Sequence, residues 1–230
     1  FFNDTATTEI YTSLFGRQRQ MCIRDSTQTV PLTGRTHRIS VSDEQVLSLS
    51  NQEYTKYMAT AKKSTNAQHT AMVQRVGRKL ATAVETYLKQ NGFANDVKNY
   101  AWEFNLVQDK SANAFCMPGG KIVVYEGLLP YTQNETALAI VLGHEIAHAV
   151  AKHSAEQLTK QQNQQVGTNI LGNVLNQAVG SGVGDLASTV AGKYFSFRNL
   201  KYSRDNETEA DYMGLIFAAM AGYNPQQAIP

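Results

Sequence analysis

The chain has 230 residues, of which 42% are hydrophobic and 17% are charged. This composition predicts a globular protein of one or two domains. The net charge of +2 gives no electrostatic footprint for nucleic acid, so we expect no nucleic-acid partner. Two cysteines are too few for a disulfide framework, and no apolar run reaches the length that spans a bilayer.

Residues 1–26 read unlike the rest of the chain. The run NDTATTEIYT, residues 3–12, resembles the translation of a sequencing flow-cell adapter, and MCIRDS, residues 21–26, resembles that of a transposase end. We therefore expect residues 1–26 to be adapter-derived and not native, and exclude them from the fold prediction. The alternative is a native, unstructured N-terminal arm. On the first interpretation Cys22 is not a native residue, and the true N-terminus, with any signal peptide, lies outside this chain.

The next segment, residues 27–65, is predicted to be a lead-in followed by a helix. Pro31 and Gly34 mark a loop, and Ser42 followed by Gln45 predicts the start of a helix that ends near residue 61. Apolar residues then recur at intervals of three and four over residues 66–90, which predicts a second helix. We expect that helix to open the main domain of the chain, residues 66–230.

Three short extended runs follow the second helix. Residues 101–108 alternate between apolar and polar side chains, and residues 114–117 and 121–125 are apolar runs separated by a Pro-Gly-Gly turn. Together they predict a small antiparallel sheet next to a long apolar helix.

That helix, expected over residues 132–153, contains the motif H-E-x-x-H. His144 and His148 are four residues apart and so lie on one helical face, from which both can reach one metal ion. Glu145 can reach a water molecule there and act as general base. The helix is apolar nearly all round and therefore buried. The alternative is that the three polar side chains only satisfy one another in a core.

A catalytic zinc site needs a third protein ligand. We expect Glu207 to supply it from a helix near residues 205–221, with Asp211 on the same face holding the second nitrogen of a ligand histidine. His153 is excluded as a ligand because, on a continuous helix, it turns away from the shared face. Alternatively, these acids only favour the start of their helix through its dipole.

Three motifs in order give a stronger indication. The runs NAFCMPGGKI, HEIAHAVAKH and SRDNETEAD resemble the zinc metallopeptidase family of HtpX and the CAAX prenyl proteases, over residues 27–230. Within it, PLTGR at residues 31–35 resembles a branch of bacterial periplasmic lipoproteins. The resemblance implies a gluzincin fold, α+β and mostly helical, with one Zn²⁺ per chain held by His144, His148 and Glu207, and with Asp211 in support. It also implies that residues 66–230 are a metallopeptidase catalytic domain truncated at its C-terminus, with a further histidine near the zinc expected beyond Pro230.

The expected activity is zinc-dependent endopeptidase cleavage with Glu145 as the catalytic base. We expect Asn113, Ala114, Phe115 and Cys116 to bind an extended peptide by strand addition, although this strand could merely close the fold. The resemblance implies misfolded or mis-assembled envelope proteins as substrates, a periplasmic location with a lipid anchor to the outer membrane, and contact with the outer-membrane assembly machinery.

Three alternatives remain open at this point. A chaperone-like assembly factor could have its zinc site closed by the Gly-rich residues 166–192. A structural zinc site would need a fourth protein ligand, and none is evident. A membrane-embedded prenyl protease is opposed by the lack of spanning segments.

Overall fold

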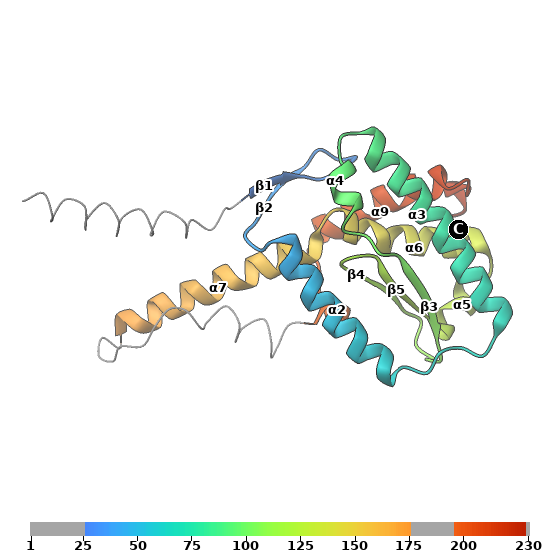
Figure 1. The fold of residues 1–230 in the computed structure, drawn as a ribbon, viewed down its shortest axis with the longest axis horizontal. Coiled ribbons are helices and arrows are strands. Elements are labelled where there is room, and N and C mark those ends of the chain that lie inside the picture. The colour runs from blue at the N-terminus through green and yellow to red at the C-terminus, as the bar shows by residue number, and fades with distance from the viewer. Residues whose placement is uncertain (1–25, 176–195, 229–230) are drawn as a thin grey trace, which may run out of the picture.

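The structure, a computed structural model, describes residues 26–175 and 196–228 (Figure 1). The predicted adapter-derived stretch, apart from Ser26, and most of the Gly-rich segment lie outside the described residues. The described helices and strands, in chain order, are β1 (Ser26–Thr29), β2 (Thr36–Ile39), α2 (Asp43–Thr60), α3 (Ala67–Gln90), α4 (Ala94–Val97), β3 (Glu103–Val107), β4 (Ala114–Met117), β5 (Lys121–Tyr125), α5 (Leu129–Thr132), α6 (Glu135–Val150), α7 (His153–Leu175) and α9 (Arg204–Met220), with 3₁₀ turns at Glu126–Leu128, Phe197–Asn199 and Pro225–Ala228.

The first two long helices begin where their polar residues predict. The Ser42 hydroxyl accepts from the backbone N–H of Gln45, and the Gln45 side chain accepts from the Ser42 backbone N–H, which is a complete capping box for α2. Asn66 caps α3 by accepting from the backbone N–H of His69. The predicted α+β, mostly helical fold is confirmed.

The three-stranded sheet is mixed, with the order β3-β5-β4. Strands β4 and β5 pair antiparallel as predicted, because the turn at residues 118–120 joins them directly. Strand β3, however, pairs parallel with the far side of β5, so the prediction of an antiparallel sheet was wrong for this strand. Residues 108–113 between β3 and β4 let the chain cross over before the hairpin begins. As a result β4 is an edge strand.

Strand β5 is buried on both faces, since each face of the sheet packs against its own hydrophobic core. Ile122 and Val124 face the core built with α3, α6 and α9. Val123 and Tyr125 face the second core, built with α2 and the start of α7. This arrangement explains why the strand is a continuous apolar run and does not alternate with polar residues. It also fixes α6 directly against the sheet (Figure 1).

Helix α6 is shorter than predicted at both ends. Its N-cap is Asn134, which accepts from the backbone N–H of Ala137, and not Thr132. Its C-terminus is a break at Lys152, which adopts φ +53°, and α7 then starts at His153. The expected continuous helix through residue 153 was therefore wrong. The break changes the direction of the chain, so α7 extends away from the body (Figure 1).

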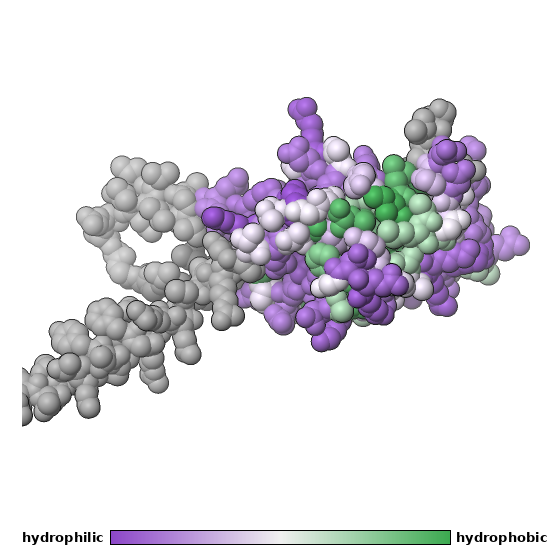
Figure 2. All heavy atoms as spheres, turned by 90° about the horizontal axis from the view of Figure 1, so that it is seen from above, coloured by the Kyte–Doolittle hydropathy of each residue, from purple (hydrophilic) through white to green (hydrophobic). Residues whose placement is uncertain are grey.

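The surface is mostly hydrophilic, with an apolar area on the face seen from above (Figure 2). Among the described residues, the large apolar side chains that are exposed are Tyr131, Tyr212 and Met220. Among residues 26–175 and 196–228, no helix combines the length and the apolar character needed to cross a membrane.

Candidate metal centre

Helices α6 and α9 bring three potential ligand side chains to one point. The Nε2 atoms of His144 and His148 lie 3.0 Å apart. The Oε2 atom of Glu207 lies 3.4 Å from the first and 3.7 Å from the second. Zn²⁺ at its usual bond lengths of 2.0–2.1 Å would separate tetrahedral ligand atoms by roughly 3.3 Å. The donor set and its spacing therefore fit one zinc ion, and the ligand atoms all lie within 4.8 Å of one another.

The orientation of the first histidine is set by Asp211, one turn beyond Glu207 on α9. The Nδ1 atom of His144 lies 2.8 Å from Oδ1 of Asp211. A carboxylate only accepts, so we assign the ring proton to Nδ1. The Nε2 atom of His144 then carries a lone pair that points at His148 and Glu207, which is the form a metal ligand needs.

The cluster is open on one side. The His148 side chain is 4% exposed, whereas that of Glu207 is 46% exposed. Burial, together with the neighbouring His144 and His153, lowers the pKa of His148 to about 2. The ring is therefore neutral at physiological pH, and a molecule from solvent can approach from the side of Glu207.

Glu145 belongs to α6, and its side chain lies on the side of this helix that packs against the edge strand β4. The backbone N–H of Cys116 in β4 interacts with its carboxylate and favours the charged form. Burial raises the pKa of Glu145 to about 8, the negative charge of Glu207 adds to the rise, and the Cys116 N–H opposes it. A carboxyl with this pKa can both take up and release a proton near neutral pH.

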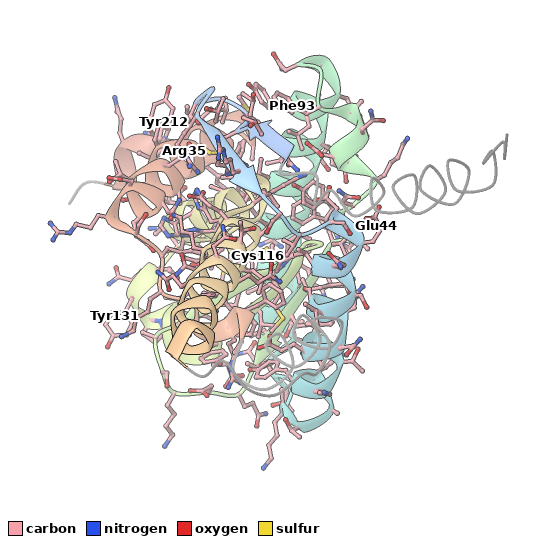
Figure 3. All side chains as sticks on the ribbon, turned by 90° about the vertical axis from the view of Figure 1, so that its left-hand side faces the viewer. Arg35, Glu44, Phe93, Cys116, Tyr131 and Tyr212 are labelled. Carbon is pink, nitrogen blue, oxygen red and sulfur yellow. The ribbon has the colours of Figure 1, made fainter. Side chains whose placement is uncertain are left out.

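The predicted substrate strand lies where it was expected, at the edge of the sheet, but its side chains are mostly buried. Ala114, Phe115 and Cys116 are buried, and Asn113 just before them is exposed. Phe115 packs edge-to-face on Tyr125 in the second core. Cys116 lies in the interior (Figure 3), so its side chain packs and does not face solvent.

Sequence reasoning missed two aromatic neighbours of the second histidine. Tyr202 stacks on the His148 ring, with centroids 4.1 Å apart and planes at 17°. The Nδ1 atom of His153 lies 2.8 Å from Nδ1 of His148. Burial lowers the pKa of His153, despite an opposing hydrogen bond with Glu209, so its ring is neutral. The signal for His153 was its five-residue spacing from His148, discarded because the helix was taken to be unbroken.

Several known proteins share sequence with this chain. Residues 67–230 match the family described as "Peptidase family M48". The chain is 41% identical over 140 residues to "Mitochondrial metalloendopeptidase OMA1" of Arabidopsis thaliana, covering 61% of this chain and 27% of that protein. It is 31% identical over 210 residues to the Saccharomyces cerevisiae protein of the same name, covering 86% and 56%.

A bacterial relative is similar over a stretch of comparable length to that of the Arabidopsis thaliana protein. The chain is 34% identical over 135 residues to "Putative beta-barrel assembly-enhancing protease" of Vibrio cholerae, covering 57% of this chain and 27% of that protein. The chain thus spans between about a quarter and somewhat over half the length of these relatives. The match to the family model covers most of the sequence, and on that basis the chain belongs to peptidase family M48.

Proposed function

We propose that this chain is a zinc-dependent endopeptidase that holds one Zn²⁺ with His144, His148 and Glu207. The observation that carries the proposal is the convergence of three ligand atoms within 4.8 Å, next to a carboxyl group, Glu145, that has no place among them. Three protein ligands leave a fourth position free, which distinguishes a catalytic zinc site from a structural one.

A bound zinc ion supplies Lewis acidity, which polarises a carbonyl group and lowers the pKa of water to about 7. The chain's own residues supply the proton transfer. The Glu145 carboxylate accepts the proton from the attacking water and returns it to the departing amine nitrogen. Asp211 keeps the proton of His144 on Nδ1 throughout, so that Nε2 stays available.

The substrate would be an extended peptide held by main-chain hydrogen bonds along β4. The strand is at the edge of its sheet, and its Cys116 N–H already reaches Glu145. A peptide added at residues 113–116 would therefore lie beside the catalytic carboxyl. Because the side chains of this strand are buried, this binding would rest on the backbone and tolerate varied sequences.

For the physiological role, we propose that the enzyme cleaves misfolded or mis-assembled bacterial envelope proteins. We propose that it does so in the periplasm, held at the outer membrane by a lipid anchor on a segment outside this chain. The relatives named for β-barrel assembly support this role and suggest the outer-membrane assembly machinery as a partner. The relatives named as mitochondrial support proteolysis but a different compartment. Fractionation of cells that express the full-length gene would separate the two.

The activity is tested by metal analysis combined with cleavage of unfolded casein. We expect about one zinc per chain and cleavage that stops when a chelator removes the metal and returns when zinc is restored. Zinc binding without any cleavage would instead support the chaperone-like assembly factor with a closed site. Cleavage that is insensitive to chelator would contradict the proposal.

A further inference from the structure

A series of buried polar groups contacts the His148 ring at Nδ1, the nitrogen that does not face the other ligands. This Nδ1 atom lies 2.8 Å from Nδ1 of His153, whose Nε2 atom lies 2.9 Å from Oε2 of Glu209. The His153 side chain is completely buried and that of Glu209 is 7% exposed. The break at Lys152 makes this possible, because it turns the first residue of α7 back beneath the ligand.

The positions of the protons follow from the acid at the end of the series. Glu209 can only accept, so the Nε2 of His153 carries a proton and donates it. In a neutral ring the other nitrogen, Nδ1, is then an acceptor. His148 must therefore donate from its own Nδ1, which leaves the lone pair on its Nε2, the atom that faces His144 and Glu207. We call this hydrogen-bonded series, His148, His153 and Glu209, the relay. The relay selects the tautomer of His148 that can bind a metal.

Glu209 is itself fixed by the turn between β1 and β2. The Thr33 hydroxyl donates to its Oε1 at 2.5 Å, and the Nε of Arg35 donates to its Oε2 at 2.8 Å. Arg35 extends from the hairpin towards α9 (Figure 3) and also reaches Glu156 on α7 at 3.0 Å. The guanidinium thus ties the hairpin to both helices that carry the relay.

We propose that His153 and Glu209 are positioning residues for the zinc ligand His148, and that Thr33 and Arg35 complete the site by holding Glu209. The inference rests on the proposed zinc site. It makes the β1–β2 hairpin, residues 26–39, part of the metal centre, although the family match begins only at residue 67. Partners that fix the far nitrogen of a ligand histidine change metal affinity by about 10–100-fold.

The central test compares His153→Leu with His153→Asn in the full chain. The two replacements have nearly the same shape, and both remove the contact with Glu209. Only asparagine offers an acceptor oxygen to the Nδ1–H of His148. We expect His153→Leu to weaken zinc binding by about 10–100-fold and His153→Asn by clearly less. Zinc affinity is measured by competition with a chromophoric chelator.

A second measurement identifies the tautomer of His148 in the zinc-free protein. Nitrogen-15 NMR of the zinc-free protein should show His148 protonated at Nδ1 in the wild type and in His153→Asn. In His153→Leu it should show a shift toward protonation at Nε2. A role confined to packing would not move the proton from one nitrogen to the other.

The hairpin is tested separately, because Arg35 is partly exposed and its loss is less disruptive to folding. We expect Thr33→Val combined with Arg35→Met to weaken zinc binding by at least about threefold. The control is Arg75→Met, which removes the ion pair between α3 and Glu135 at the start of α6, away from the relay. Its zinc affinity should match the wild type.

The outcomes separate the two proposals. If the wild type binds no zinc, the proposed function fails. If the wild type binds zinc and His153→Leu has the same zinc affinity as His153→Asn, the relay is disproved even though the zinc site stands. If His153→Leu does not fold, the Thr33 and Arg35 double variant decides: affinity equal to that of Arg75→Met overturns the inference, and weaker affinity with a displaced His148 proton supports it.

Discussion

Gly143 of α6 and Gly214 of α9 lie so close together that neither has room for a methyl group. A Cβ atom on Gly143 would be 2.6 Å from the carbonyl oxygen of Gly214, and one on Gly214 would be 2.6 Å from the backbone nitrogen of His144. The contact occurs next to a proposed ligand, so it sets the distance between the helix that carries the histidines and the helix that carries Glu207.

We therefore expect Gly214→Ala to separate α6 from α9. The overpacking should lower the free energy of unfolding by about 1–3 kcal/mol. Zinc affinity should fall as well, because Glu207 would move away from His144 and His148. Urea unfolding and chelator competition measure the two effects.

The control for this change is Gly77→Ala in α3. A Cβ at that position would lie 2.1 Å from the ring of Phe104, in the core and away from the metal centre. It should destabilise the fold but leave the zinc affinity of the folded protein unchanged. If both variants affect zinc equally, the glycine contact does not position the ligands.

Glu145→Gln should abolish proteolysis while zinc still binds. The amide keeps the shape of the side chain but cannot take a proton from water, and general base catalysis contributes about 10²–10⁴-fold to the rate. Casein cleavage and zinc affinity are measured on the same preparation. Cleavage at the wild-type rate would rule out Glu145 as the base, and loss of zinc would mean that the residue holds the metal centre together.

The local features of this fold could be predicted from the sequence because short-range chemistry determines them. The caps Ser42 and Asn66 and the four-residue spacing of His144 and His148 each act within one helical turn. The same is true of Glu207 and Asp211 on α9.

The features that were missed depend on contacts between distant parts of the chain. Strand β3 pairs with the side of β5 away from β4, where it also packs against α3. The residue pattern within β3 does not encode this packing. The break at Lys152 was missed because a lysine in a left-handed conformation lacks the glycine that usually marks such a turn. That one dihedral angle brings His153 beneath His148. The hairpin contact of Arg35 with Glu209 spans 174 residues and leaves no local signal.

Tyr202 is expected to support His148 through its ring and not through its hydroxyl. The two rings are stacked, while the hydroxyl lies 2.8 Å from the Ser154 hydroxyl. Stacking of this kind is worth about 0.5–1.5 kcal/mol, which corresponds to about 2- to 10-fold in zinc affinity. Tyr202→Ala should show this loss and Tyr202→Phe should not. Equal losses in both variants would assign the effect to the hydroxyl.

Stability should fall in acid partly through Glu156, which links α7 to the hairpin. The hydrogen bond with His37 holds the pKa of this carboxyl well below its usual range, and Lys160 and Arg35 lower it further. The unfolded chain, with a glutamate pKa of about 4.3, therefore binds a proton more readily than the folded chain. The stabilisation is complete above that value and is lost as the pH falls toward the folded-state pKa.

Glu156→Gln replaces the carboxylate with a neutral amide and so removes its pH-dependent contribution to the free energy of unfolding. At pH 7 we expect the variant to be less stable by about 1.5–3 kcal/mol, the range for hydrogen bonds to a charged group. The difference from the wild type should narrow below about pH 5, because the wild-type carboxylate loses its advantage there. Urea unfolding of the zinc-free proteins at pH 7 and at acid pH measures both values and avoids the pH dependence of metal binding. A difference that stays constant with pH would mean that Glu156 stabilises the fold by packing alone.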